Sequence, residues 1–184
     1  KDKKDGEWSV WFENGGLSHK GNYSKDLENG LWESWYEIGQ LKDQGHYANG
    51  KLHGNWVGFW LNSNKNYQGE YENDLKSGEW TYWYSNEKLN ETGSYTIVED
   101  NGFVLKTKKS VKDGLWVSYS NIDFQKTHEE TYKKGVKNGA WKYYYPGGVI
   151  VASENSFKGG FLDGKSSTYS RRGQLLNEIT FKSN

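Results

Sequence analysis

The chain of 184 residues carries 24 basic and 24 acidic side chains, no Cys and no Met, and 17% of its residues are aromatic. A mean hydropathy of −1.04 usually indicates disorder, but aromatic side chains bury roughly 150–250 Å² each, so this composition predicts a folded protein whose core is built from rings. The absence of Cys excludes disulfides and thiolate chemistry. The balanced charge argues against nucleic-acid partners, and no stretch approaches the ~18 apolar residues of a transmembrane segment.

The sequence begins Lys1-Asp2-Lys3-Lys4 without an initiator Met. We therefore expect that an upstream segment was removed, either by cleavage of an export signal or by trimming. Of these two explanations we favour export, to the periplasm or the cell surface, over a cytoplasmic location.

A motif of Gly, any residue and Trp recurs every 24 residues in the first part of the chain and predicts a repeat architecture. Its fifth copy follows after 36 residues, because the fourth repeat holds twelve inserted residues at about 95–110, and the seventh copy has Ser in place of Trp. The leading glycines of the seven repeats are Gly6, Gly30, Gly54, Gly78, Gly114, Gly139 and Gly164. We interpret residues 1–184 as a single repeat domain.

Aromatic residues recur at fixed places inside each repeat. We call the side chains five positions after each leading Gly the offset-five rings: Trp11, Trp35, Phe59, Trp83, Tyr119, Tyr144 and Tyr169. A second aromatic column consists of Tyr23, Tyr47, Tyr71, Tyr95, Tyr132, Phe157 and Phe181. In the first four repeats a Gly stands two residues before the second ring, at Gly21, Gly45, Gly69 and Gly93.

The second repeat illustrates the local structure that we expect throughout. Residues 32–36 favour a strand, 38–40 a turn, 41–47 a return strand and 48–53 a turn into the next repeat. A helix is disfavoured, because the chain lacks a period of 3.6 residues and holds 23 Gly.

Neighbouring hairpins can bury rings in columns that no single hairpin could bury alone. Alternation along residues 32–36 places Trp32, Ser34 and Tyr36 on one face and Glu33 and Trp35 on the other. The fold class predicted is all-β: an elongated, twisted, single-layer antiparallel sheet of about fourteen strands, with no central globular core.

The insertion in the fourth repeat is interpreted as a hairpin lengthened past the edge of the sheet. Asp100-Asn101-Gly102 is a strong turn signal between two β-favouring segments, 95–99 and 103–107. Apolar residues occupy both alternation positions, so one set can pack on the sheet while the other is exposed, covered by a partner or buried within the insertion itself. These candidate partner-binding residues are Ile97, Val98, Phe103, Val104 and Leu105.

The stretch Gly45-His-Tyr-Ala-Asn-Gly-Lys-Leu-His-Gly-Asn-Trp56 resembles the MORN repeat, whose consensus runs Gly-x-Tyr/Trp-x-Asn-Gly-Lys-x-His-Gly. The 24-residue spacing with Gly-x-Trp-x-x-Tyr/Trp-Tyr resembles its bacterial variant, which is often described as an antitoxin. The resemblance covers all seven repeats. It is tight in the first three and looser from the fifth, where Glu130, Asn155 and Ile179 replace the Gly before the second ring.

The resemblance implies stacked antiparallel hairpins that act as a scaffold in protein–protein contacts. Some eukaryotic members of the family are credited with phospholipid binding, but this chain has no basic excess, which argues against a lipid role here. A weaker similarity to choline- and glucan-binding repeats is confined to Trp141-Lys-Tyr-Tyr-Tyr145.

No catalytic, cofactor or metal signature is found in the sequence. His19, His46, His53 and His128 fall at different offsets in their repeats and form no metal-ligand spacing; we expect His53 to have a structural role in its turn. Carboxylate pairs such as Glu70 and Glu72 are typical of solvated strand faces, and no phosphate-binding loop is present. We therefore predict that the protein is not an enzyme and has no cofactor.

The offset-five rings are the most informative candidates for a binding surface. Trp11, Trp35, Phe59, Trp83, Tyr119 and Tyr144 would form a row on one face that can grip an extended peptide, a partner's surface or a glycan chain. Alternatively, the row only stiffens a sheet that is wet on both faces. An open sheet also exposes its terminal strands, and edge-strand or end-to-end association is plausible because only residues 1–5 guard the first strand.

We favour a non-enzymatic protein–protein interaction scaffold, an accessory subunit of a larger complex in the cell envelope. The alternatives are a glycan-binding module that uses the offset-five rings and a toxin-neutralising antitoxin. The sequence does not identify the protein partner.

Overall fold

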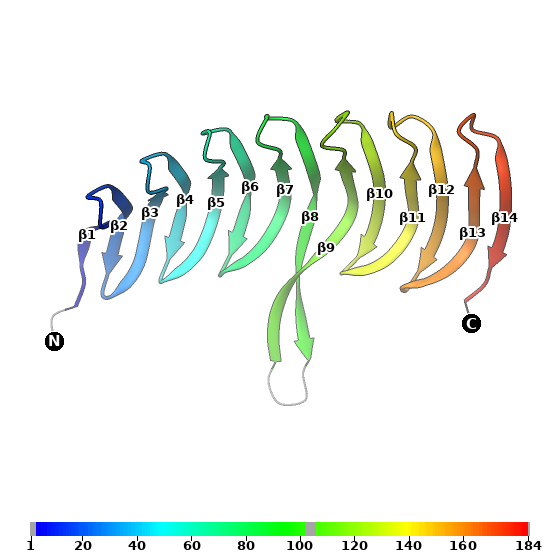
Figure 1. Ribbon diagram of the computed structural model, residues 1–184. Helices are drawn as coiled ribbons and strands as arrows, with labels where there is room; N and C mark the ends of the chain where they lie inside the picture. Colours follow the sequence, from blue (N-terminus) through cyan, green and yellow to red (C-terminus); the bar gives the residue numbers. More distant parts are fainter. Residues whose placement is uncertain (1–2, 102–105, 184) are drawn as a thin grey trace. The chain divides into compact units, whose positions relative to one another are not determined.

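The structure is a computed structural model that describes residues 3–101 and 106–183. Contacts divide the chain into two compact units, residues 1–87 and residues 88–184, called here the N-terminal and C-terminal units. Each is built from β-strands in chain order (Figure 1).

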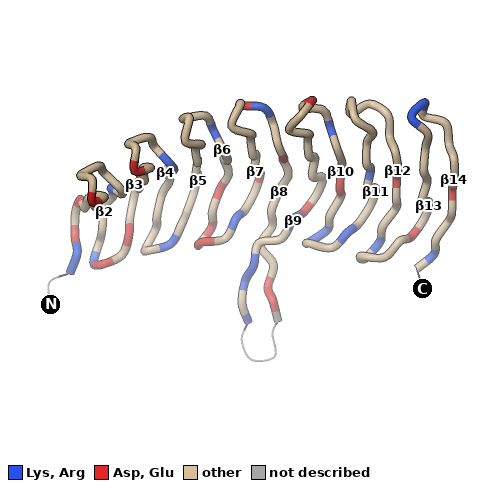
Figure 2. The backbone as a smooth tube through the Cα atoms, viewed as in Figure 1, with Lys and Arg blue, Asp and Glu red and all other residues tan. Residues whose placement is uncertain are grey.

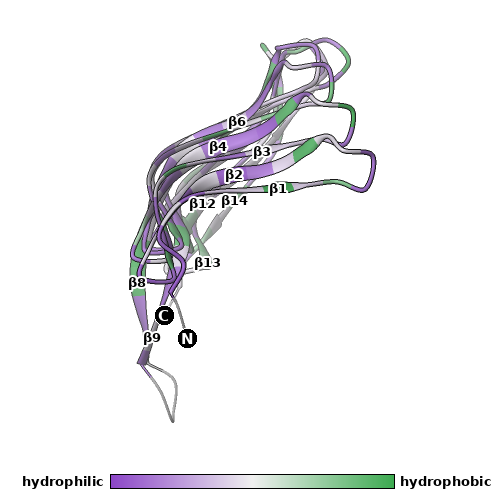
Figure 3. Ribbon diagram, turned by 90° about the vertical axis from the view of Figure 1, so that its left-hand side faces the viewer, coloured by the Kyte–Doolittle hydropathy of each residue, from purple (hydrophilic) through white to green (hydrophobic). Residues whose placement is uncertain are grey.

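The N-terminal unit is an antiparallel meander in which each strand pairs with its neighbours in the sequence. Its strands are β1 (Gly6–Trp11), β2 (Leu17–Ser24), β3 (Leu27–Trp35), β4 (Leu41–Ala48), β5 (Lys51–Phe59), β6 (Lys65–Glu72) and β7 (Leu75–Trp83). Figure 3 shows from the side that these strands bend along their length.

The C-terminal unit repeats the same plan with one longer hairpin. Its strands are β8 (Leu89–Asn101), β9 (Lys106–Tyr119), β10 (Lys126–Lys133), β11 (Val136–Tyr144), β12 (Val151–Lys158), β13 (Phe161–Tyr169) and β14 (Leu175–Phe181).

The predicted all-β class of stacked antiparallel hairpins is confirmed. No helix occurs among residues 3–101 and 106–183, and within each unit the strands that pack on one another are those that neighbour each other in the sequence. Each unit is thus one layer of hairpins with no second layer over it, and its apolar contacts run from strand to strand.

The turn predicted over 48–53 is shorter in the structure, because residues 51–53 belong to β5, and the leading glycines of the second and third repeats lie inside strands. Gly30 and Gly54 lie inside β3 and β5 with φ of +79° and +73°, where they form bulges against the preceding strand, as the register step from Gly45↔Trp56 to His46↔His53 shows. The turn before β5 is only Asn49-Gly50, with φ of 52° and 77°, because two left-handed residues give the tight turn that matches strand twist. β3 and β5 therefore begin three residues before their leading Gly.

In four repeats the Trp of the Gly-x-Trp motif packs face-on over a Gly of the preceding strand: Trp32, Trp56, Trp80 and Trp116. Trp56 lies over Gly45 so closely that a Cβ at position 45 would lie 2.2 Å from its ring, and its Nε1 donates to the carbonyl of His46 at 3.1 Å. The same pair of contacts joins Trp80 to Gly69 and Glu70. The Gly two residues before the second ring is therefore required for space, and this contact explains the column seen in the sequence.

Edge-to-face ring contacts continue this packing from repeat to repeat. In the N-terminal unit the chain of contacts, with ring centroids 5.1–6.2 Å apart, is Trp8, Tyr23, Trp32, Tyr47, Trp56, Tyr71 and Trp80. Such pairs add about 0.5–1.5 kcal/mol each beyond the burial of area. Trp80 and Trp116 are only 1% exposed, so these rings are the core of a structure that has no second layer.

Hydrogen bonds at both ends of the hairpins hold successive repeats together. At one end, the Tyr36 hydroxyl donates to the carbonyl of Phe59 at 2.9 Å, and the Tyr145 hydroxyl donates to that of Tyr169 at 2.8 Å. At the other end, the Gly50 N–H donates to the carbonyl of Glu28 at 2.8 Å. Tyr36 and Tyr145, each six positions after its leading Gly, therefore link neighbouring turns.

The described part of the insertion in the fourth repeat belongs to two long paired strands. β8 and β9 pair from Glu91↔Ser118 to Asn101↔Lys106 and extend beyond the neighbouring turns of their unit (Figure 1). Two residues of the turn predicted at 100–102, Asp100 and Asn101, are strand residues of β8, and Gly102 lies outside the described residues. Phe103, Val104 and Leu105 lie outside the described residues.

Candidate binding surface

The offset-five rings occupy the face opposite the packed tryptophans. Asn55, Val57 and Phe59 alternate with Trp56 along β5 and therefore lie on the other side of the sheet. Trp11 is 60% exposed, while the five other predicted rings are half-buried: Trp35, Phe59, Trp83, Tyr119 and Tyr144. The rings thus present surface to solvent, and their role as a binding site stays a prediction.

Two shallow cavities lie on this face in the N-terminal unit and share Asn55 and Gln68. The first, of about 460 Å³, is lined by Phe59, Gln44 and both of these amides. The second continues past them to Trp83 and is lined by carboxylates as well. The face is therefore a hollowed surface on which rings alternate with amide and acidic groups.

In the C-terminal unit, contacts within β10 and between β10 and β11 hold a charged side chain on the same face. The Tyr144 hydroxyl and the Lys126 ammonium both donate to Glu129, at 2.9 and 2.7 Å. Burial alone would favour the protonated form of Glu129, but these two bonds outweigh it and hold the pKa of this carboxyl below its usual value. Burial and the bond to Glu129 raise the pKa of Tyr144, so this ring is held in place by its hydroxyl.

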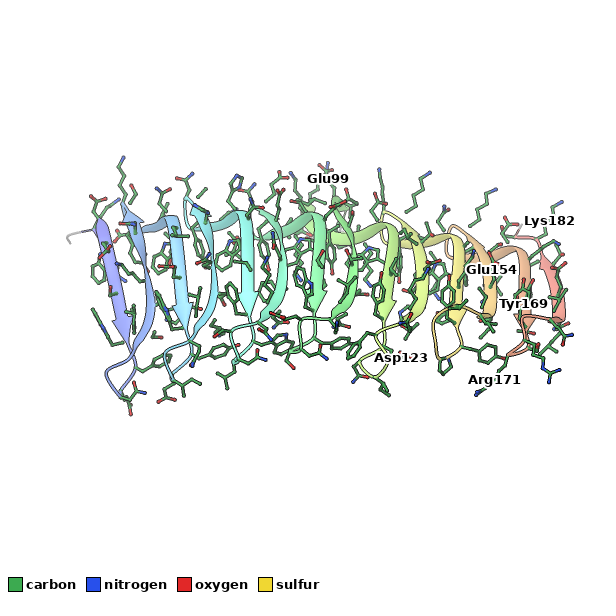
Figure 4. The ribbon with its side chains drawn as sticks, turned by 90° about the horizontal axis from the view of Figure 1, so that it is seen from above. Glu99, Asp123, Glu154, Tyr169, Arg171 and Lys182 are labelled. Carbon is green, nitrogen blue, oxygen red and sulfur yellow. The ribbon has the colours of Figure 1, made fainter. Side chains whose placement is uncertain are left out.

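Figure 4 shows where other charged groups of the C-terminal unit lie: Asp123 and Arg171 at its turn edge, and Glu99 and Lys182 at the opposite edge. Asp123 accepts the Gly147 N–H at 3.0 Å. Hydrogen bonds, first from Ser120 and then from backbone N–H groups, lower its pKa. Arg171 lies over the Tyr145 ring at 5.5 Å, so both Asp123 and Arg171 have structural contacts between neighbouring turns.

The arms of the long hairpin carry opposite charges. Lys106, Lys108 and Lys109 lie on β9, and the acidic residues Glu99 and Asp100 lie on β8 (Figure 2). The Lys109 ammonium lies 2.7 Å from Asp100.

Two of the predicted hairpin residues, Ile97 and Val98, are half-buried on β8 opposite Ser110 and Lys109. Their role in partner binding is untested.

Sequence reasoning missed a pairing of histidines. His46 and His53 lie directly opposite each other on β4 and β5, both exposed, because the bulge at Gly54 shifts the register by two residues. In the parts of the chain that the structure describes, no group of three His, Asp or Glu side chains is arranged to hold a metal ion. The pair therefore has no third protein ligand.

Sequence reasoning also missed a column of lysines on the tryptophan face. The signal is a Lys two residues before the leading Gly, present in four repeats as Lys4, Lys76, Lys112 and Lys137. Each ammonium lies 4.0–4.6 Å from the ring of the Trp four residues later. At these distances a cation is attracted to the face of the ring.

Stacked hairpins of one layer, held by ring contacts that recur once per repeat, define a β-hairpin repeat protein. The chain belongs to the MORN repeat variant family, whose model matches residues 4–25, 28–49, 76–96, 137–158 and 162–183, more than half of the chain. The match confirms the resemblance noted in the sequence. Repeats of this kind are generally associated with interactions with proteins or membranes.

No curated protein matches the chain in sequence. Across residues 3–101 and 106–183, no helix is long and apolar enough to span a membrane.

Proposed function

We propose that the protein is a non-enzymatic scaffold that binds another protein through the offset-five face. The observation that carries the proposal is the row of half-exposed rings on a face that no second layer covers, with Trp11 60% exposed at its start. Trp and Tyr bury a large area at a low cost in side-chain entropy, and they dominate the energetics of protein interfaces.

The experiment is affinity capture from the native host with three versions of the full chain. Trp11→Thr with Trp83→Thr removes two rings of the face while it retains a residue type that favours strands. The matched control, Ile122→Ser with Val149→Ser, removes two apolar side chains that are 85% and 82% exposed outside this face.

We expect the wild type and the control to recover the same stoichiometric protein and the ring variant to lose it. Recovery of no stoichiometric protein by any version, with the isolated chain monomeric, contradicts the proposal. If all three versions of the chain recover the partner equally, the interface lies elsewhere, and the assignment of this face is contradicted.

A second candidate, a glycan-binding module, is favoured by the cavity of about 460 Å³ in which Phe59 adjoins Gln44, Asn55 and Gln68. Rings stack on the apolar faces of sugars, and amide groups donate to and accept from hydroxyls. Titration of the chain with soluble oligosaccharides, monitored by Trp fluorescence, tests this candidate. A saturable response that Phe59→Ala removes supports it, and a flat response excludes it.

The scaffold proposal includes the absence of catalysis, which is supported by the lack of a catalytic motif in the sequence. Export to the periplasm or cell surface is also a proposal, and fractionation of the native host tests it. Recovery of the full-length protein in the cytoplasmic fraction alone contradicts export.

A further inference from the structure

The repeats show what normally lies over their packed tryptophans. Lys137 holds its ammonium 4.1 Å from the Trp141 ring and 5.0 Å from the Phe157 ring. Lys4 spans Trp8 and Tyr23 in the same way, at 4.6 and 4.7 Å. The space between the offset-two Trp and the second ring of a repeat is therefore a place that an ammonium group fits, and Lys4, Lys112 and Lys137 fill it in their own repeats.

The second and third repeats lack this lysine. The position two before the leading Gly is Glu28 in the second repeat and Leu52 in the third. Among residues 3–101 and 106–183, no Lys or Arg lies over the ring of Trp32 or Trp56. Trp56 is 8% exposed, whereas Trp116, which lies under a lysine, is 1% exposed.

A cavity of about 290 Å³ lies at these two repeats. Its walls include the rings of Trp32, Tyr47, Trp56 and Tyr67, and the carboxylate of Asp43. Lys42 is the one basic residue besides His19 on the wall, and its ammonium lies over none of the described rings. A cavity walled by aromatic faces and a carboxylate is suited to an organic cation.

The charge around the cavity is negative. Burial raises the pKa of Tyr47, and the carboxylates of Glu28, Asp43 and Asp74 raise it further. Burial and then Asp43 also raise the pKa of Tyr67. Carboxylates from three strands or turns thus act on the same hydroxyl, and the field that disfavours a tyrosinate there favours a cation.

We propose that the cavity between Trp32 and Trp56 binds the ammonium group of a lysine side chain presented by a partner protein. The inference rests on the proposed scaffold function and names the group that the partner contributes. The partner's lysine would take the place that Lys4, Lys76, Lys112 and Lys137 occupy in the other repeats. The N-terminal unit then binds a lysine of the partner on one face of the sheet, and the offset-five rings supply contact area on the other face.

The test is a titration of the full chain with Nα-acetyl-lysine methylamide, monitored by the indole N–H signals of the tryptophans in NMR spectra. We expect saturable shifts at Trp32 and Trp56, and none with Nα-acetyl-norleucine methylamide, which has a similar stem without the charge. If the uncharged probe shifts the same indole signals equally, the inference is contradicted.

Two variants identify the site. Leu52→Lys restores the lysine of the other repeats, and we expect it to weaken binding of the lysine probe about tenfold, since the restored ammonium competes with the probe for the face of the Trp56 ring. Leu52→Met fills the same position without charge and should bind like the wild type. Asp43→Asn, which keeps an oxygen to accept the Ser34 hydroxyl bond seen at 2.7 Å, should also weaken binding. Unchanged binding in both Leu52→Lys and Asp43→Asn overturns the inference.

The outcomes separate this inference from the scaffold proposal. Tetramethylammonium binding without lysine-probe binding overturns the lysine assignment and indicates a small quaternary ammonium ligand. A saturable lysine titration together with failed capture from the host supports the cavity chemistry and counts against the scaffold. Capture that persists in Leu52→Lys, with no response to the lysine probe, overturns the cavity inference and leaves the scaffold intact.

Discussion

The indole of Trp56 lies over the backbone of Gly45, its partner on the neighbouring strand, with no room for a side chain between them. The contact recurs between Trp32 and Gly21. It lets a single-layer sheet bury rings without a second layer, because the buried side of the indole is covered by main chain. The hydrogen bond from Trp56 Nε1 to the His46 carbonyl fixes the ring in that place.

Gly45→Ala is expected to destabilise the N-terminal unit by about 1–3 kcal/mol, the usual cost of overfilling a packed site. The new Cβ would lie 2.2 Å from the Trp56 ring, which must move and strain its hydrogen bond. Urea unfolding monitored by Trp fluorescence measures the loss. The matched control is Asn155→Ala, at the same column position on β12 but opposite Ser166; it removes one hydrogen bond, worth about 1 kcal/mol. An unchanged midpoint in Gly45→Ala would falsify the role assigned to this glycine.

Gly54 tests a different requirement of glycine. Nothing lies within 4 Å of a Cβ built on it, but its φ is +73°. Gly54→Ala is therefore expected to cost about 1–2 kcal/mol through backbone strain, and Gly54→Asn should cost less because Asn enters the left-handed region more readily. At Gly45 the order should reverse, since the larger Asn meets the same ring. The same rank order at both positions would contradict the distinction between space and conformation.

Much of the fold could be predicted from the sequence because one contact recurs in register. The spacing of Trp56 and its counterparts indicated antiparallel hairpins, and the extra residues before Lys112 indicated a longer one. The bulge at Gly54 could not be predicted, because a glycine with positive φ has the same sequence signature inside a strand as in a turn. The opposition of His46 and His53 follows from that bulge and was missed with it.

Of the two candidate sites, one could be found from the sequence and the other could not. The offset-five rings form a column in the sequence and were found from it, whereas Asp43 belongs to no aromatic column and gave no signal. Its place beside Tyr47 and Tyr67 depends on pairing between strands. The role of the lysine column in which Leu52 is an exception could not be predicted, because it depends on contacts such as that of Lys137 with the Trp141 ring.

The long hairpin is expected to be dispensable for folding. Replacing residues 97–110 by Asn-Gly joins Thr96 to Val111, which already face each other across β8 and β9, and restores the 24-residue spacing with the turn that precedes β5. The hairpin's exposed ion pair contributes little, because exposed pairs are worth about 0–1 kcal/mol. We expect a midpoint within about 1 kcal/mol of wild type in urea unfolding and an unchanged circular dichroism spectrum per residue. Loss of cooperative unfolding would show that the arms are part of the core.

Alkaline pH is expected to unfold the protein through Tyr67. Burial, and then the Asp43 carboxylate, raise the pKa of this hydroxyl above its ordinary value of 10.0. Below pH 10 the hydroxyl is neutral in both the folded and the unfolded chain, so its contribution is fully present. As pH rises above 10, the unfolded chain releases the proton while the folded chain retains it, and stability falls until the raised folded pKa is passed.

Tyr67→Phe removes this linkage, since Phe has no proton to lose. Its unfolding free energy should therefore fall less steeply with pH above 10 than that of the wild type, whatever the two values are at neutral pH. Urea midpoints measured at neutral pH and about one unit above the ordinary tyrosine pKa give the two slopes. Parallel slopes would mean that Tyr67 ionises as readily in the folded sheet as in the unfolded chain. That result would contradict the burial of its hydroxyl on the tryptophan face.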